Sequence, residues 1–333
     1  MRKLSYTILV LFAGLGLFSP VFALTVSPVK IDITGDPGTT VHGEIELFNE
    51  QDSNKTFYSS FENFETNGES GAPSFVGAKD GLATWLQTDT QVVLNSNQRT
   101  KVPFSITIPY GAEAGGYFAA IFFGSQPPGK QESSQLAIGG KLGILVFLKV
   151  SGKVEEGGGL LDFTTKNNQI FFDALPINFY YRVNNTGGDR VIPQGLLEVK
   201  NLGFLNSFSG KANLKDGSVL PRSIRKFEVG WVNDQALSEK EKSELGFFGK
   251  AFLELKAFNF GWYTANLNIF WGENNSKSFS SRLSFFIIPW HLLMIVGVFL
   301  LVVLGFGFFG LKRYNRWIIA KATKSRRKRK IDE

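Results

Sequence analysis

The segment between Arg282 and Lys312 constrains this 333-residue chain more than any other feature. It contains no Asp, Glu, Lys or Arg, and its last 20 residues, Leu292 to Leu311, are all Leu, Val, Ile, Phe, Met or Gly. A helix of about 20 apolar residues is long enough to cross the hydrocarbon core of a bilayer. A buried helix of a soluble domain is the alternative, but such a helix rarely runs this long without a polar face. The sequence therefore predicts one transmembrane helix, at residues 287–311.

The charges that follow this segment predict its orientation. Residues 312–333 hold ten Lys or Arg side chains against only Asp332 and Glu333. Basic residues next to a transmembrane helix are retained on the cytoplasmic side. Residues 312–333 are therefore predicted to be a cytoplasmic tail, and the rest of the mature chain is predicted to be extracellular. Near the surface, each basic residue adds about 1 kcal/mol of attraction to anionic lipid.

The N-terminus has the three parts of a secretory signal. Arg2 and Lys3 give the positive start, residues 4–18 are mostly apolar, and Pro20 precedes small-residue cleavage positions that end at Ala23. This pattern is typical of a signal peptide at residues 1–23, cleaved so that the mature chain begins at Leu24. An uncleaved N-terminal anchor is the alternative. Either interpretation places the chain in the cell membrane as an exported protein.

Charge and cysteine content exclude some classes of function. The chain carries 36 basic and 29 acidic residues, a formal charge of +7. Setting aside two basic residues of the signal, and ten basic and two acidic residues of the tail, leaves 24 against 27, about −3. The basic charge thus reports topology, and we expect no nucleic-acid partner. The absence of cysteine means that the exported part is stable without disulfides, which favours a bacterial surface.

Between the signal and the helix, the sequence predicts short β-strands. Apolar and polar residues alternate in Gly43 to Asn49 and in Val102 to Ile108, and Gly, Asn, Asp and Pro separate such runs. Many short alternating strands with turns between them are typical of a β-sandwich. A polar insertion, Asp234 to Lys250, has Ser238 and Glu241 at the spacing of a helix capping box and predicts a short surface helix.

An internal repeat indicates two such sandwiches. Residues 115–123 read GGYFAAIFF and residues 261–269 read GWYTANLNI, so both fit G-x-Y-x-A-x-[IL]-x-[FI]. Period two places the Tyr, Ala, Ile or Leu, and Phe or Ile on one face, which we assign to the core. An earlier pair, IELFN at 45–49 and YRVNN at 181–185, ends in each case at an Asn suited to starting a turn.

The predicted fold class is all-β, with two immunoglobulin-like β-sandwich domains followed by one transmembrane α-helix. Three consecutive glycines at 157–159 form a natural hinge between the sandwiches. The first domain is predicted at residues 24–156 and the second at 160–284. Because the second ends almost at the helix, we expect it to stand close to the lipid surface.

Residues 82–123 resemble a known family. They contain LATWL at 82–86, VPFSITIP at 102–109 and GGY at 115–117. This segment is similar to the N-terminal domain of bacterial WxL-interacting surface proteins and, more loosely, to the immunoglobulin-like fold of pilus chaperones. The resemblance implies a first sandwich that binds peptidoglycan, a second that engages a partner, and an anchoring C-terminal helix. It covers core and turn positions, so no ligand-contact residue is carried over.

Catalytic groups are scarce. The chain has no thiol, its two histidines are His42 and His291, and it contains no G-x-S-x-G nucleophile elbow. A two-histidine zinc site outside the membrane is not possible with His291 at the membrane edge. The many acids always permit a carboxylate pair, but the most visible one, Glu155 and Glu156, adjoins the glycine hinge. We therefore predict a non-enzymatic protein without cofactor or metal.

Strand parity selects four aromatic residues as candidates for ligand binding. Trp262 and Phe270 in the second domain, and Phe118 and Phe122 in the first, fall on the face opposite the predicted core. Exposed aromatic rings stack on sugar rings or contact proteins. Packing against a neighbouring sheet or domain equally explains why these four side chains face away from the core, so both interpretations stay open.

These observations favour a membrane-anchored cell-surface adaptor that binds cell-wall glycan, another surface protein, or both through its two sandwiches. The alternative is an envelope assembly factor, similar to a chaperone, which docks an extracellular protein client by strand addition at a sheet edge. A sensor whose basic tail contacts a cytoplasmic partner is a third hypothesis. The tail, about 22 residues long, is too short to fold as a signalling domain.

Overall fold

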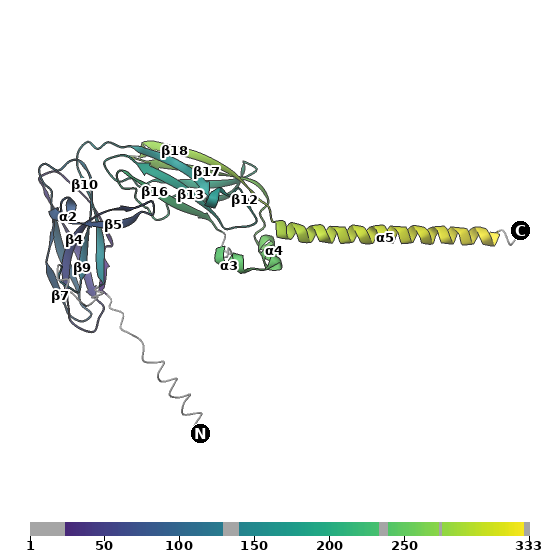
Figure 1. The fold of residues 1–333 in the computed structure, drawn as a ribbon, viewed down its shortest axis with the longest axis horizontal. Coiled ribbons are helices and arrows are strands. Elements are labelled where there is room, and N and C mark those ends of the chain that lie inside the picture. The colour runs from purple at the N-terminus through teal and green to yellow at the C-terminus, as the bar shows by residue number, and fades with distance from the viewer. Residues whose placement is uncertain (1–23, 129–139, 233–238, 273–274, 330–333) are drawn as a thin grey trace, which may run out of the picture. The chain divides into compact units, whose positions relative to one another are not determined.

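The computed structural model describes residues 24–128, 140–232, 239–272 and 275–329. The predicted signal peptide lies outside these residues. The described chain is built mostly of β-strands and ends in one long helix (Figure 1), so the predicted all-β fold with a C-terminal apolar helix is confirmed. These described residues form two compact units, the first from those up to 158 with 185–191 and 219–224, and the second from those at 159–184, 192–218 and after 224.

The first unit is a sandwich of two sheets. One sheet has the order β1-β3-β8-β6, with β1 Leu24–Ser27, β3 Thr40–Asn49, β8 Arg99–Thr107 and β6 Leu86–Thr88. The other has the order β2-β10-β9-β4-β5, with β2 Lys30–Gly35, β10 Lys141–Val150, β9 Gly115–Gly124, β4 Lys55–Asn67 and β5 Ala72–Gly77. Strand β7, Gln91–Leu94, pairs with β4, and a short helix, α2, covers Leu82–Trp85.

Alternating apolar residues of both sheets form the core of this unit. Ile45 and Leu47 of β3 are fully buried and share one cluster with Ile121 of β9 and Ile144 of β10. Trp85 packs against the same cluster, with its ring 4.6 Å from that of Tyr117. The period-two pattern read from the sequence therefore gives the correct inward face for these strands.

The second unit is a sandwich of the same kind. Its three-stranded sheet has the order β11-β13-β16, with β11 Gly158–Thr165, β13 Ile177–Asn185 and β16 Ser223–Trp231. Its five-stranded sheet has the order β12-β18-β17-β14-β15, with β12 Phe171–Phe172, β18 Lys277–Ile287, β17 Gly261–Trp271, β14 Gln194–Asn201 and β15 Leu205–Lys211. The short helices are η1 Lys166–Asn168, α3 Glu239–Glu244 and α4 Phe247–Lys256.

The repeat occupies equivalent positions in the two sandwiches. Its two copies are strands β9 and β17, and its Ala, Ile or Leu, and Phe or Ile residues are buried in both. Asn49 and Asn185 end β3 and β13, and both are fully buried. The Asn49 amide donates to the carbonyls of Ser53 and Asn95, and the Asn185 amide donates to those of Asp189 and Val219. Each Asn thus ties its strand end to a neighbouring loop.

Helix α5, Trp290–Arg329, follows β18 after two residues. Its segment Trp290–Ile319 is long and apolar enough to cross a membrane, and its most apolar stretch is not buried against the rest of the chain. The predicted boundaries need correction. The helix starts at Trp290 instead of 287, because residues 285–287 complete strand β18 and Pro289 precedes the helix. It also continues through the basic segment as far as Arg329.

Candidate docking edge

The two sandwiches differ in how they cover the edge of their last strand. In the first, β2 runs parallel to β10 and pairs residues 30–35 with residues 145–150. In the second, β12 runs parallel to β18 but pairs only Phe171 with Phe286 and Phe172 with Ile287. Within the described residues, no strand pairs with β18 from Ser278 to Phe285 on the side opposite β17. A long sheet edge is therefore left open in the second sandwich.

The open edge results from where the chain crosses between sheets. In the first sandwich the crossing lies between β1 and β2, after Ser27, so β2 has six residues left to cover β10. In the second, the chain stays in the three-stranded sheet until Thr165, turns through η1, and reaches the other sheet only at Phe171. The Thr165 hydroxyl donates to the carbonyl of Gln169 and holds this late turn. Little strand remains to pair with β18.

Strand β18 is regular along the open edge. Its register with β17 runs from Lys277 to Ile287 without a bulge, and it contains no proline. The N–H groups of Phe286 and Ile288 donate to the carbonyls of Ile170 and Phe172 on the β12 side. Because the backbone direction alternates along an antiparallel strand, the N–H groups of Ser280, Arg282 and Ser284 point to the same side. Among the described residues no backbone group pairs with these N–H groups, so they can donate to an added strand.

Two other edge strands, β5 and β15, carry features that oppose strand addition. Strand β5, at one edge of the first sandwich, contains Pro73, and its register with β4 shifts at Asn63. Strand β15, the other edge of the five-stranded sheet, pairs with β14 through a register shift at Val199. Proline and bulges are common protections of exposed edges. Strand β18 lacks both and carries one charged side chain, Arg282, in the middle of its open part.

The outer face of the five-stranded sheet is polar in its centre. Arg282 Nε donates to Asn266 Oδ1 at 2.9 Å, and the hydroxyl of Ser280 donates to Asn268 Oδ1 at 2.7 Å. Trp262 and Phe270, two of the predicted ligand-binding residues, are both 42% exposed at the two ends of β17. Eight residues at about 3.3 Å each separate them by roughly 26 Å. They therefore do not form one aromatic platform.

The other two predicted ligand-binding residues are Phe118 and Phe122. Both face away from the main core, as the strand alternation predicts, but neighbouring side chains cover them. Phe122 is only 5% exposed, its ring is 4.9 Å from that of Phe75, and Lys141 Nζ lies 4.3 Å from its centre. Phe118 packs against the rings of Phe64 and Phe147. A ligand would have to displace these neighbours to stack on either ring.

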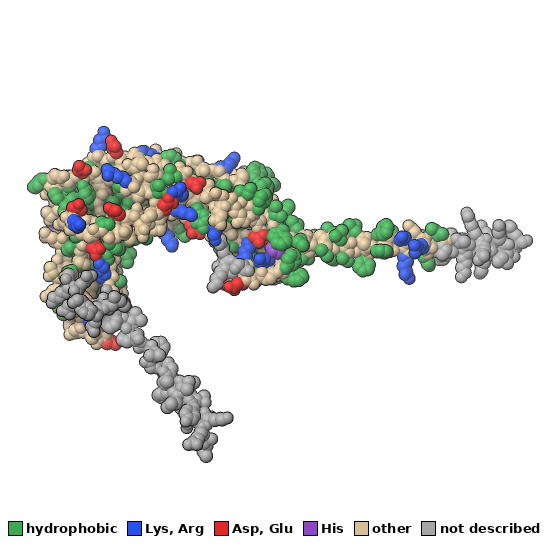
Figure 2. Space-filling model, viewed as in Figure 1, with side chains coloured by type: hydrophobic (Ala, Val, Ile, Leu, Met, Phe, Trp, Pro, Cys, Tyr) green, Lys and Arg blue, Asp and Glu red, His purple; other side chains and the backbone are tan. Residues whose placement is uncertain are grey.

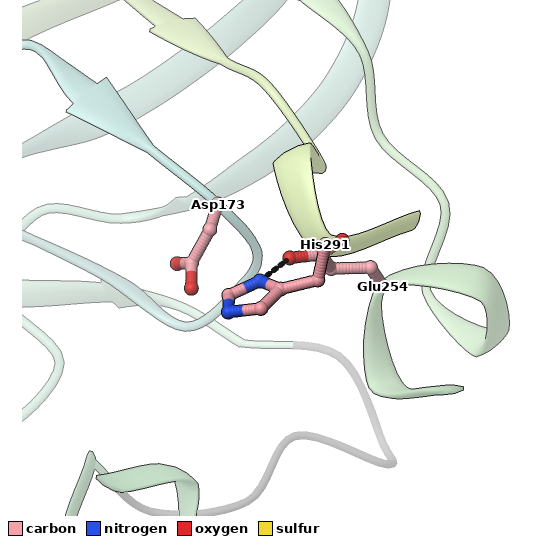
Figure 3. A group of neighbouring side chains, drawn as sticks. All are labelled: Asp173, Glu254 and His291. Atoms are coloured by element: carbon pink, nitrogen blue, oxygen red, sulfur yellow. Dashed lines mark hydrogen bonds and ion pairs between the residues drawn. The ribbon is translucent and has the colours of Figure 1, made fainter. Parts of the chain in front are cut away.

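Three titratable side chains gather where α5 leaves the second sandwich (Figure 3). Asp173, Glu254 and His291 offer ligand atoms within 4.8 Å of one another. His291 Nδ1 lies 2.5 Å from Glu254 Oε1, and Glu254 Oε2 accepts the N–H of Leu292 at 2.8 Å. Lys242 Nζ donates to Asp173 at 2.6 Å and to the carbonyl of Ala174 at 3.1 Å. The group therefore links α4 to the first turn of α5.

This arrangement suits a structural link better than a metal site. A cation at Asp173 would compete with the ammonium group of Lys242, which already lies within hydrogen-bond distance. Burial acts to raise the pKa of Asp173, but the hydrogen bond and charge of Lys242 outweigh it and hold that pKa below its usual value. Sequence reasoning placed His291 at the membrane edge but missed Glu254, because 37 residues separate the two.

Comparisons with known proteins give likeness of fold at low sequence identity. No protein-family model matches the chain, and no curated protein matches it. A solved Class 5 fimbriae chaperone, CfaA, is 10% identical over 80% of this chain and all of its own, with a TM-score of 0.37. The E. coli chaperone DraB is 10% identical over 80% of this chain and 95% of its own, with a TM-score of 0.33.

A third solved structure, the Pseudomonas aeruginosa CupB2 chaperone, is 9% identical over 78% of this chain and all of its own, with a TM-score of 0.34. These structures belong to the looser of the two resemblances read from the sequence. None of these three structures is a WxL-interacting protein, so that resemblance stays a prediction.

Proposed function

We propose that this chain is a non-enzymatic, membrane-anchored docking protein of the cell surface, and that it receives an extended segment of an extracellular protein client at the open edge of β18. The observation that carries the proposal is the unpaired side of β18 from Ser278 to Phe285, within the described residues. A client strand there would gain main-chain hydrogen bonds and extend the five-stranded sheet by one strand.

Helix α5 supports the anchoring half of this proposal. It starts two residues after β18, so a client docked on β18 would be held close to the bilayer. The basic residues after Leu311 favour a cytoplasmic C-terminus and attraction to anionic lipid. We place the protein in the cell membrane as a single-pass chain with its sandwiches outside.

A proline at Ser284 tests the docking half. The Ser284 N–H points to the open edge, so Ser284→Pro removes one docking group while the ladder with β17 keeps its hydrogen bonds. Ser284→Ala is the matched control because it removes the hydroxyl and keeps the N–H. A photo-crosslinking residue at Ser278 should join one protein through a contiguous segment, in the Ser284→Ala chain but not in the Ser284→Pro chain. Crosslinking that Ser284→Pro leaves unchanged would reject the proposal.

The polar outer face supports a second candidate, binding of cell-wall glycan. Asn266, Asn268 and Arg282 offer amide and guanidinium groups beside the exposed ring of Phe270. Such a combination suits sugar hydroxyls and the apolar face of a sugar ring. The test is sedimentation of the chain with purified peptidoglycan sacculi. Saturable binding that Phe270→Ala abolishes would support it, and no binding at high protein concentration would exclude it.

A further inference from the structure

Helix α4 buries some of its apolar side chains and leaves others exposed. Ala251 and Leu253 are buried, whereas Phe248, Phe252 and Leu255 are exposed, with Phe248 78% exposed. The spacing of i, i+4 and i+7 places these three exposed side chains on one face of the helix. A surface helix of a soluble domain normally turns polar residues outward. The outer face of α4 therefore needs an apolar environment that the described chain does not supply.

Nearby loops extend this apolar face. Phe258 and Phe260 are exposed in the connection from α4 to β17, and Phe204 is 72% exposed in the turn between β14 and β15. The Leu202 N–H donates to the carbonyl of Trp262 at 3.0 Å, which fixes this turn beside the start of β17. We name the membrane-end surface by its six side chains: Phe204, Phe248, Phe252, Leu255, Phe258 and Phe260. An apolar group of this kind marks an interaction site.

The membrane-end surface adjoins the first turn of α5. It lies at the end of the sheet where β17 begins and β18 ends, and hydrophobic side chains gather where α5 leaves the sandwich (Figure 2). Glu254 fixes α4 to α5 through His291 and the Leu292 N–H. The ring of Phe247 packs 6.1 Å from that of Trp290. The exposed face of α4 is thereby held in a set position next to the apolar surface of α5.

We propose that the membrane-end surface inserts into the interfacial layer of the bilayer that α5 crosses; this inference rests on the anchoring part of the proposed function. Lipid is the occupant because the surface is continuous with the start of α5, the level at which a spanning helix enters hydrocarbon. Aromatic side chains gather at that level in membrane proteins, and Lys256 on α4 is exposed to meet phosphate headgroups. The second sandwich thus rests on the bilayer by six apolar side chains as well as by its helix.

Site-directed spin labelling of the full chain in phosphatidylcholine and phosphatidylglycerol nanodiscs tests this inference. The chain has no cysteine, so each variant carries one label. Labels are placed through Phe258→Cys and Phe204→Cys on the surface, Leu301→Cys in the middle of the apolar segment of α5, and Ser278→Cys at the opposite end of β18. We expect the labels at 204, 258 and 301 to lose access to a water-soluble nickel chelate and to gain access to oxygen, whereas the label at 278 stays in water.

The outcomes separate the two proposals. If the label at 301 is in lipid while those at 204 and 258 are as accessible to nickel as that at 278, surface insertion is wrong and the anchor stands. If the label at 301 is also in water, the anchor itself is wrong. If a protein partner covers this surface in place of lipid, the labels at 204 and 258 should be accessible to water, because the nanodisc contains only this chain and lipid. Two surface sites are labelled so that the test remains valid if one of the two variants folds poorly.

Discussion

Replacing Glu254 should loosen α4 from α5. The carboxylate is 1% exposed and accepts two hydrogen bonds, from His291 Nδ1 at 2.5 Å and from the Leu292 N–H at 2.8 Å. In Glu254→Ala both donors stay in a dry site without an acceptor. A buried donor left without an acceptor costs about 1–3 kcal/mol, and Glu254→Ala leaves two such donors. We therefore expect the free energy of local opening of α4 to fall by roughly 3 kcal/mol.

Hydrogen exchange of the α4 amides measures this change. A loss of roughly 3 kcal/mol corresponds to about a 100-fold faster exchange, since each 1.4 kcal/mol is a factor of ten. Glu254→Gln should give a smaller effect, because its amide oxygen still accepts the Leu292 N–H. Glu198→Ala is the control, since it removes a long, partly exposed contact with Lys200 worth about 0–1 kcal/mol. Unchanged exchange at residues 247–256 in Glu254→Ala would refute this account of the link.

Two further predictions concern stability. Lys242→Met should destabilise the second unit by about 0.5–1 kcal/mol at neutral pH, since the ion pair with Asp173 is partly exposed. Because Lys242 lowers the pKa of Asp173, its contribution is present above the unfolded-state pKa of about 3.9 and is lost as the pH falls through the folded-state pKa. Urea unfolding at neutral and acidic pH checks this, and an equal loss at both would contradict it. Asn185→Ala should lower the free energy of unfolding by about 2–4 kcal/mol, because three backbone groups lose a buried partner. A urea midpoint close to that of the unaltered chain would contradict this.

Much of the fold could be predicted from the sequence because two local patterns dominate it. Period-two alternation gave the inward face of β9 and β17, and the charge-free segment after Arg282 gave the apolar helix. The boundary between strand and helix was missed, because residues 285–287 are as apolar as the helix that follows. Only pairing with β17 assigns them to a strand.

The candidate sites depend on contacts that no local pattern reports. Parity identified Phe122 as outward-facing, but the residues that cover it, Phe75 and Lys141, come from other strands. The edge of β18 is open because the chain passes from the three-stranded to the five-stranded sheet only at η1, more than a hundred residues before β18. The polar insertion, Asp234 to Lys250, predicted a surface helix, and α3 forms within it. The exposed apolar face of α4 was missed because it extends past Lys250, the last residue of that insertion.

The measurement that most directly tests strand docking is residue-resolved hydrogen exchange along β18, on the chain alone and on the crosslinked client complex. For the chain alone, we predict fast exchange at Ser280, Arg282 and Ser284 and slow exchange at Ser281 and Leu283, whose N–H groups point toward β17. In the complex, the three fast amides should become slow. Slow exchange at these amides in the chain alone, or no protection in the complex, would contradict docking at this edge.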